Sequence, residues 1–150
     1  PKDSSLCTRA IIKVRLRRGT ARNPRLVVED IRTQKEEMSE SVELHQVSEA
    51  VMREMTRQVR LEARSKKKCA GEGSEPLDAE SISGEPLNSN DGVCTQKIII
   101  VELVSPTAPN LDIVDTPGLI AARSAGRPAD VVKTTSDLVR RYAVEHKDNA

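Results

Sequence analysis

The sequence predicts an α/β fold in which helices flank an incomplete mixed sheet. Some stretches alternate apolar and charged residues, which indicates strands, while others repeat apolar residues every three or four positions, which indicates helices. The two kinds of stretch follow one another along the chain, as they do in α/β proteins. This order excludes an all-helical bundle.

The first strand is expected over residues 10–16, where Ile12 and Val14 alternate with charged residues. A break at residues 19–24 separates it from a short apolar run at residues 26–28. We expect these two runs to pair as a hairpin.

A helix is expected next, because one apolar stripe repeats at spacings of three and four and comprises Leu44, Val47, Val51, Met55 and Val59. Ser39 is a candidate N-cap, and the lysines at residues 66–68 suit the negative end of the helix. Residues 66–92 follow without any periodicity and are rich in Gly, Pro, Ser and acids. Loops of this length are uncommon in compact domains, so we expect a disordered insert there.

Two further strands are expected at residues 98–104 and 111–114, on either side of a Ser-Pro turn. The second of these, Leu-Asp-Ile-Val, is a mainly apolar run, which indicates a buried strand. After it, Pro128 suits the first turn of a last helix. That helix has its own apolar stripe, formed by Val131, Thr135, Leu138 and Tyr142.

Composition limits the function classes. The chain has 24 basic and 23 acidic residues, so no overall field attracts it to nucleic acid, and no nucleic-acid partner is expected. It contains no Phe and no Trp, so the core must be aliphatic. Its three cysteines are widely spaced and lack zinc-site spacing, which favours reduced thiols in the cytosol. No apolar run approaches the roughly 20 residues that a membrane-spanning helix needs.

The Asp-Thr-Pro-Gly motif at residues 115–118 directly follows the last expected strand. An acid at a strand end followed by a Pro-Gly turn is how P-loop GTPases reach their nucleotide. The carboxylate holds the Mg²⁺ shell, usually through water, and the glycine N–H faces the γ-phosphate without an obstructing Cβ. An ordinary Asp-x-Pro-Gly turn is the alternative interpretation.

The residues before this motif strengthen the GTPase interpretation. The strand at 98–104, the Ser-Pro-Thr-Ala-Pro-Asn turn at 105–110 and the segment 111–118 together resemble the dynamin superfamily of large GTPases. Cys7-Thr8-Arg9 and the strand after it resemble the first switch of that family, and residues 41–64 resemble one of its helices. The resemblance covers residues 4–64 and 93–147.

The resemblance implies that residues 1–150 are part of a dynamin-type GTPase domain with the partial sandwich of a P-loop GTPase. It implies GTP and Mg²⁺ as ligands, with Thr8 as a catalytic and metal-binding residue, Asp115 as a metal- and nucleotide-binding residue, and Gly118 as a nucleotide-binding residue. Residues 120–127 stand where such GTPases have their second switch. Without the resemblance, Thr8 is a strand-entry threonine and Asp115 a turn former.

Two GTPase motifs are absent from these 150 residues. No Gly-Lys dipeptide is present, so there is no Gly-x-x-x-x-Gly-Lys-Ser/Thr phosphate loop, and no Thr/Asn-Lys-x-Asp motif selects guanine. In the resembled family both motifs lie outside the span seen here. We therefore expect an internal piece of a GTPase domain that does not bind or hydrolyse GTP alone. The complete protein is expected to be cytoplasmic, to self-assemble and to associate peripherally with membranes. The alternative is a degenerate, nucleotide-free scaffold or partner-binding domain.

Overall fold

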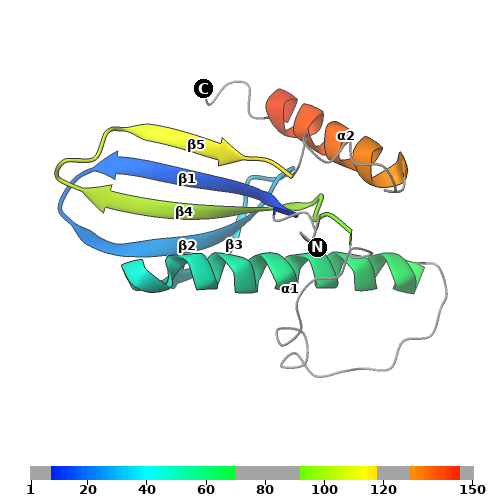
Figure 1. The fold of residues 1–150 in the computed structure, drawn as a ribbon, viewed down its shortest axis with the longest axis horizontal. Coiled ribbons are helices and arrows are strands. Elements are labelled where there is room, and N and C mark those ends of the chain that lie inside the picture. Colours follow the sequence, from blue (N-terminus) through cyan, green and yellow to red (C-terminus); the bar gives the residue numbers. More distant parts are fainter. Residues whose placement is uncertain (1–7, 70–91, 118–128, 146–150) are drawn as a thin grey trace, which may run out of the picture.

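The computed structural model describes residues 8–69, 92–117 and 129–145. Within this part of the chain, five strands form one mixed sheet in the order β3-β2-β4-β1-β5, with helices α1 and α2 beside it (Figure 1). The elements in chain order are β1 (Ile11–Arg18), β2 (Arg22–Asp30), β3 (Glu36–Ser41), the 3₁₀ turn η1 (Leu44–Gln46), α1 (Val47–Cys69), β4 (Lys97–Ser105), β5 (Leu111–Asp115) and α2 (Ala129–Glu145). The expected α/β class, a mixed sheet with flanking helices, is confirmed.

The expected pairing of the first two strands is wrong. β4 lies between β1 and β2, parallel to the first and antiparallel to the second. β2 instead forms its hairpin with β3, which is the next element in the chain. Pattern analysis did not detect β3, because its sequence is polar. Most of its side chains are solvent-exposed at the sheet edge, so the strand needs no apolar residues there.

β2 begins at Arg22, inside the segment where a break was expected. Its register with β4 shifts between Arg22 and Arg25. Pro24 lies in this irregular stretch, which suits a residue that has no N–H to donate to a ladder. The Pro24 carbonyl still accepts a hydrogen bond from the Val42 amide, at 2.8 Å.

The first helix begins later than its expected N-cap. Ser39 lies in β3, where its hydroxyl accepts a hydrogen bond from the Arg25 guanidinium at 2.6 Å. Of the expected apolar stripe, Met55 and Val59 are buried, whereas Leu44 is 71% exposed because it belongs to the 3₁₀ turn before the helix.

The helix also continues beyond its expected end. α1 runs to Cys69, so residues 66–69 of the expected insert are helical. Residues 70–91 of that insert lie outside the described residues.

The core is aliphatic, as composition requires, and lies on both faces of the sheet. On the α1 face it contains Ala10, Leu26, Val42, Ala50, Met55, Val59, Cys94, Ile99 and Val101. On the α2 face it contains Ile11, Val27, Ile31, Val93, Ile98, Ile100 and Leu138, with Tyr142 packed against them. Thr135 and Leu138 of the expected α2 stripe are buried, while Pro128 and the side chain of Val131 lie outside the described part.

β5 is not the buried strand that its apolar sequence indicated. It pairs only with β1 among the described strands and forms an edge of the sheet. Leu111, Ile113 and Val114 are 46%, 51% and 38% exposed. An apolar run at a free sheet edge leaves both its side chains and its backbone groups available for another segment.

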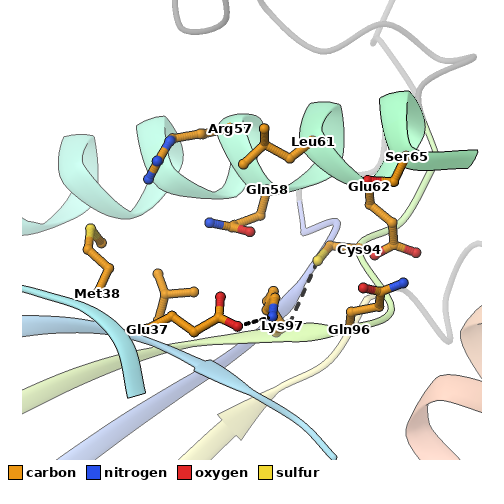
Figure 2. A pocket seen from close by; sticks show the side chains of 11 residues that line it. Glu37, Met38, Arg57, Gln58, Leu61, Glu62, Ser65, Cys94, Gln96 and Lys97 are labelled. Carbon is orange, nitrogen blue, oxygen red and sulfur yellow. Dashed lines mark hydrogen bonds and ion pairs between the residues drawn. The ribbon is translucent and has the colours of Figure 1, made fainter. Parts of the chain in front are cut away.

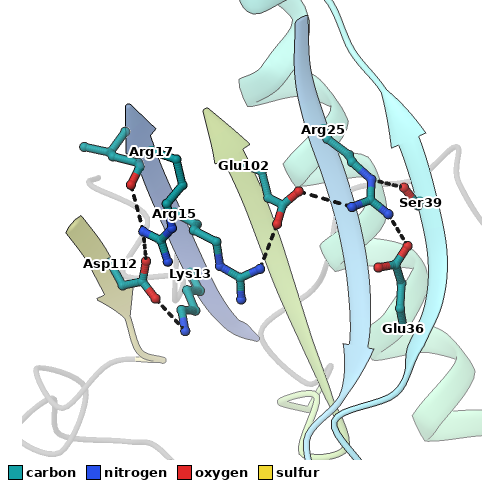
Figure 3. A network of polar contacts seen from close by, with 9 residues as sticks. Lys13, Arg15, Arg17, Arg25, Glu36, Ser39, Glu102 and Asp112 are labelled. Carbon is teal, nitrogen blue, oxygen red and sulfur yellow. Dashed lines mark hydrogen bonds and ion pairs between the residues drawn. The ribbon is translucent and has the colours of Figure 1, made fainter. Parts of the chain in front are cut away.

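A ladder of ion pairs crosses one face of the sheet from strand to strand (Figure 3). Glu102 on β4 accepts from Arg15 at 2.7 Å and from Arg25 at 3.2 Å, and Asp112 on β5 pairs with Lys13 and Arg17. Burial alone raises the pKa of Glu102, but the hydrogen bonds and charges of its two arginines outweigh burial and leave this pKa below its ordinary value. These pairs tie four neighbouring strands together by side chains as well as by backbone.

Asp30 closes the turn between β2 and β3. Its Oδ1 accepts hydrogen bonds from the backbone N–H groups of Arg32 and Thr33, and its Oδ2 pairs with Lys97 at 3.0 Å. The Thr33 N–H is the largest cause that lowers the pKa of Asp30, and Lys97 adds to it, so that the pKa falls to about 2. Gln34 follows with a φ of 54°, as a tight turn requires.

We expect Asp30→Asn to lower the free energy of unfolding by about 1 kcal/mol at pH 7. Because the folded-state pKa lies below the unfolded one, the charge of Asp30 stabilises the fold above about pH 4 and loses its effect as pH falls through about 2. Urea unfolding followed by circular dichroism at pH 7 and pH 2.5 should show the difference shrinking. Asp137→Asn, at an exposed position of α2, is the control. An equal difference at both pH values would contradict this account.

Candidate functional site

Thr8 and Asp115 meet at one end of the sheet, although 107 residues separate them. Thr8 precedes β1 and Asp115 is the last residue of β5, and these two strands are antiparallel neighbours. The start of β1 therefore adjoins the end of β5, where Ile12 is the pairing partner of Asp115. The Thr8 hydroxyl donates a hydrogen bond to Asp115 Oδ2 at 2.9 Å. The structure thus brings together two of the three site residues expected from the sequence.

The two side chains differ in how they are held. Asp115 is exposed, so its carboxylate is open to a ligand from solvent. Thr8 is half-buried and joins directly to a buried segment. Next to it, Arg9 is only 2% exposed; its N–H contacts the Met55 sulfur at 3.2 Å and its carbonyl accepts from the Cys94 amide at 2.8 Å. These two backbone contacts of Arg9 therefore hold the chain next to Thr8 in place.

A hydroxyl and a carboxylate are hard oxygen donors, which is the donor type that Mg²⁺ selects. Two such groups are too few for a complete protein shell, and the described ranges contain no group of three or more His, Cys, Asp or Glu side chains placed to hold a metal ion. Mg²⁺ in nucleotide enzymes is held by one or two protein oxygens together with phosphate oxygens and water. Thr8 and Asp115 fit that arrangement.

The remaining parts of the expected site lie outside the described residues. These are Gly118 and the segment 120–127 that was expected to form the second switch. Pro117, the last described residue before this gap, is buried.

A separate cavity of about 240 Å³ lies between α1 and the β2–β3–β4 side of the sheet (Figure 2). Glu37, Arg57, Glu62 and Lys97 contribute its charges. Its one thiol, Cys94, is buried, and burial together with the nearby Glu62 carboxylate raises the pKa of Cys94 to about 11. A thiol held protonated in this way is a poor nucleophile.

Sequence analysis assigned no role to the polar side chains that α1 buries. Glu54, Gln58 and Glu62 lie four residues apart on α1 and are all buried, and among them Glu62 is the one that contacts the chain beside the candidate site, through Thr95. The available signal was their spacing, since positions i, i+4 and i+8 share one helix face with each other.

No helix in the described ranges is both long enough and apolar enough to cross a bilayer.

Comparison with known sequences identifies relatives of this chain. The sequence profile described as Dynamin family matches residues 1–150. Over 77 residues, 49% of this chain, the sequence is 30% identical to the interferon-induced GTP-binding protein Mx of Epinephelus coioides. Over 72 residues, 46% of this chain, it is 31% identical to the interferon-induced GTP-binding protein Mx1 of Equus caballus. The matched segments span only 12% and 11% of these two relatives.

Proposed function

The chain belongs to the dynamin family, and from this membership we propose that the complete protein binds and hydrolyses GTP with the help of Mg²⁺. One observation carries the proposal, the 2.9 Å hydrogen bond between the Thr8 hydroxyl and the Asp115 carboxylate. It supports the proposal because the family resemblance assigns these two groups to the metal and to the first switch. The Mx relatives, described as GTP-binding proteins, favour the same nucleotide.

Each residue has a distinct role in this proposal. The Thr8 hydroxyl would be a ligand of Mg²⁺, and the Thr8 carbonyl would help to position the attacking water. Asp115 would hold the metal shell through water, and the Gly118 N–H would bind the γ-phosphate. When bound, Mg²⁺ neutralises the charge that develops on the phosphate oxygens. Thr8 and Asp115 position water and phosphate rather than form covalent bonds.

The phosphate-binding loop must come from residues outside this sequence, because no such motif occurs within it. The free edge of β5 is a suitable place for the strand that carries the loop. Ile113 and Val114, which point to opposite faces of the sheet, are both exposed there, and Asp115 lies at the tip of the same strand. A strand added at this edge would bring its loop close to the Thr8–Asp115 pair.

Self-assembly, peripheral membrane association with membrane remodelling, and a cytoplasmic location of the complete protein also belong to the proposal. They rest on family membership alone. The second candidate function is a nucleotide-free, partner-binding scaffold, which is favoured by the missing phosphate loop.

Residues 1–150 alone are expected to bind no GTP, because the groups that cradle phosphate and select guanine are missing from them. Isothermal titration with GTP and Mg²⁺ should give no binding heat for this polypeptide and clear binding for the complete protein. Binding by the 150 residues alone would contradict the assignment of the phosphate site to other residues. A complete protein that binds no nucleotide would favour the scaffold.

Asp115→Asn in the complete protein is expected to lower kcat for GTP hydrolysis about 100-fold, the scale found when an outer-shell metal partner is lost. Asp112→Asn is the matched control, because Asp112 lies on the same strand but faces the opposite side of the sheet and pairs with Lys13 and Arg17. Steady-state phosphate release at several Mg²⁺ concentrations tests both variants. If Asp112→Asn lost as much activity as Asp115→Asn, the metal role of Asp115 would be refuted.

Thr8→Ala is expected to lower kcat about 100-fold, whereas Thr8→Ser keeps most of the activity because the hydroxyl is retained. The same phosphate-release assay compares the alanine and serine variants. The melting temperature of each variant is the control for folding. Equal activity of the alanine and serine variants would show that the hydroxyl has no role in hydrolysis.

A further inference from the structure

Thr95, two residues before β4, is held by side chains from both helices. Its N–H donates to Glu62 Oε2 of α1 at 2.6 Å, and its hydroxyl donates to the other oxygen of the same carboxylate. Its carbonyl accepts a hydrogen bond from Arg141 of α2. All three polar groups of one loop residue are therefore satisfied by two long side chains that arrive from different helices.

Glu62 is suited to this task because it is charged although buried. It is 7% exposed, and Lys66 pairs with it at 2.9 Å. Burial raises the pKa of Glu62, but the hydrogen bonds from Lys66 and Thr95 outweigh burial and leave the pKa below its ordinary value. In Figure 2 the Glu62 side chain points from α1 toward the chain around Cys94. At neutral pH it is a carboxylate, which accepts stronger hydrogen bonds than a neutral group does.

A short path leads from Thr95 to the candidate site. Cys94 is covalently next to Thr95, is 1% exposed, and donates its N–H to the Arg9 carbonyl at 2.8 Å. Arg9 is covalently next to Thr8, whose hydroxyl reaches Asp115. Since Cys94 and Arg9 are close-packed, a displacement of Thr95 has no room to be absorbed between them.

We propose that Glu62 and Arg141 are positioning residues for the GTPase site: by fixing Thr95 they hold Thr8 in place opposite Asp115. The effect on turnover rests on the proposed function, whereas the mechanical link does not. A shift of about 1 Å in a positioned group is enough to slow an enzyme strongly, even when the change lies far from the chemistry.

The chain offers a matched control on the same helix. Glu54 lies two turns before Glu62 and is 4% exposed, so its removal also creates a defect under α1. Its hydrogen bonds go to Arg57 and Gln58, which belong to the same helix. If both residues contribute only to stability, replacing Glu54 or Glu62 should have the same effect on kcat. If Glu62 is a positioning residue, only its replacement should lower kcat.

In the complete protein, Glu62→Ala and Arg141→Ala are expected to lower kcat for GTP hydrolysis about tenfold or more while leaving KM for GTP nearly unchanged. Glu54→Ala should lower the melting temperature and leave kcat unchanged when assayed well below that temperature. Glu62→Gln keeps an oxygen acceptor for the Thr95 N–H and should recover most of kcat. If Glu62→Ala does not fold, Arg141→Ala tests the proposal from the other helix.

Amide hydrogen exchange without nucleotide tests the mechanical link independently of activity. Exchange at the amides of Cys94 and Arg9 should become faster in the Glu62 and Arg141 variants and stay unchanged in the Glu54 variant. If the unaltered protein hydrolyses no GTP, the proposed function fails, and the exchange data still decide on the link. The proposal is overturned if exchange at both amides is unaffected, or if the Glu54 and Glu62 variants lose kcat equally.

Discussion

The antiparallel pairing of β1 with β5 is the constraint on which the candidate site depends. In this register the residues before β1 lie beside the end of β5, so the Thr8 hydroxyl reaches the Asp115 carboxylate across 107 residues of sequence. A slip by one residue would turn Asp115 to the other face of the sheet. The ion pairs of Asp112 with Lys13 and Arg17 lie on the opposite face of the same strand pair.

The contacts that hold the backbone next to Thr8 are a second constraint on the candidate site. Arg9 is buried and contacts α1 through Met55, and the loop before β4 contacts both helices through Thr95. The catalytic hydroxyl of the proposed function therefore lies on a packed backbone, while the carboxylate beside it stays open to solvent. A rigid donor next to an accessible acid is a reasonable arrangement for a metal ion that arrives together with its nucleotide.

Pattern analysis predicted the elements well where packing follows periodicity. The α1 stripe at Met55 and Val59 and the α2 residue Leu138 are buried as expected. Pattern analysis failed where contacts between distant segments decide which residues form a strand and which strands pair. β3 is polar because it lies at an exposed edge, and the pairing of β1 with β4 depends on contacts that no local pattern reports. The Thr8–Asp115 pair was predictable from motif resemblance, whereas the Glu62–Thr95 contact was not, because a lone acid on a helix is usually solvated.

The parallel pairing of β1 with β4 also has a consequence for how the chain folds. Its partners are 87 residues apart, and β4 must enter between β1 and the already adjacent β2–β3 hairpin. Closing so long a loop costs entropy before any contact compensates for it, and topologies rich in such distant pairs reach the native state slowly. Until this pairing forms, the Ile-rich β4 segment lacks its partner β1, and unpaired apolar strands of this kind are prone to aggregate.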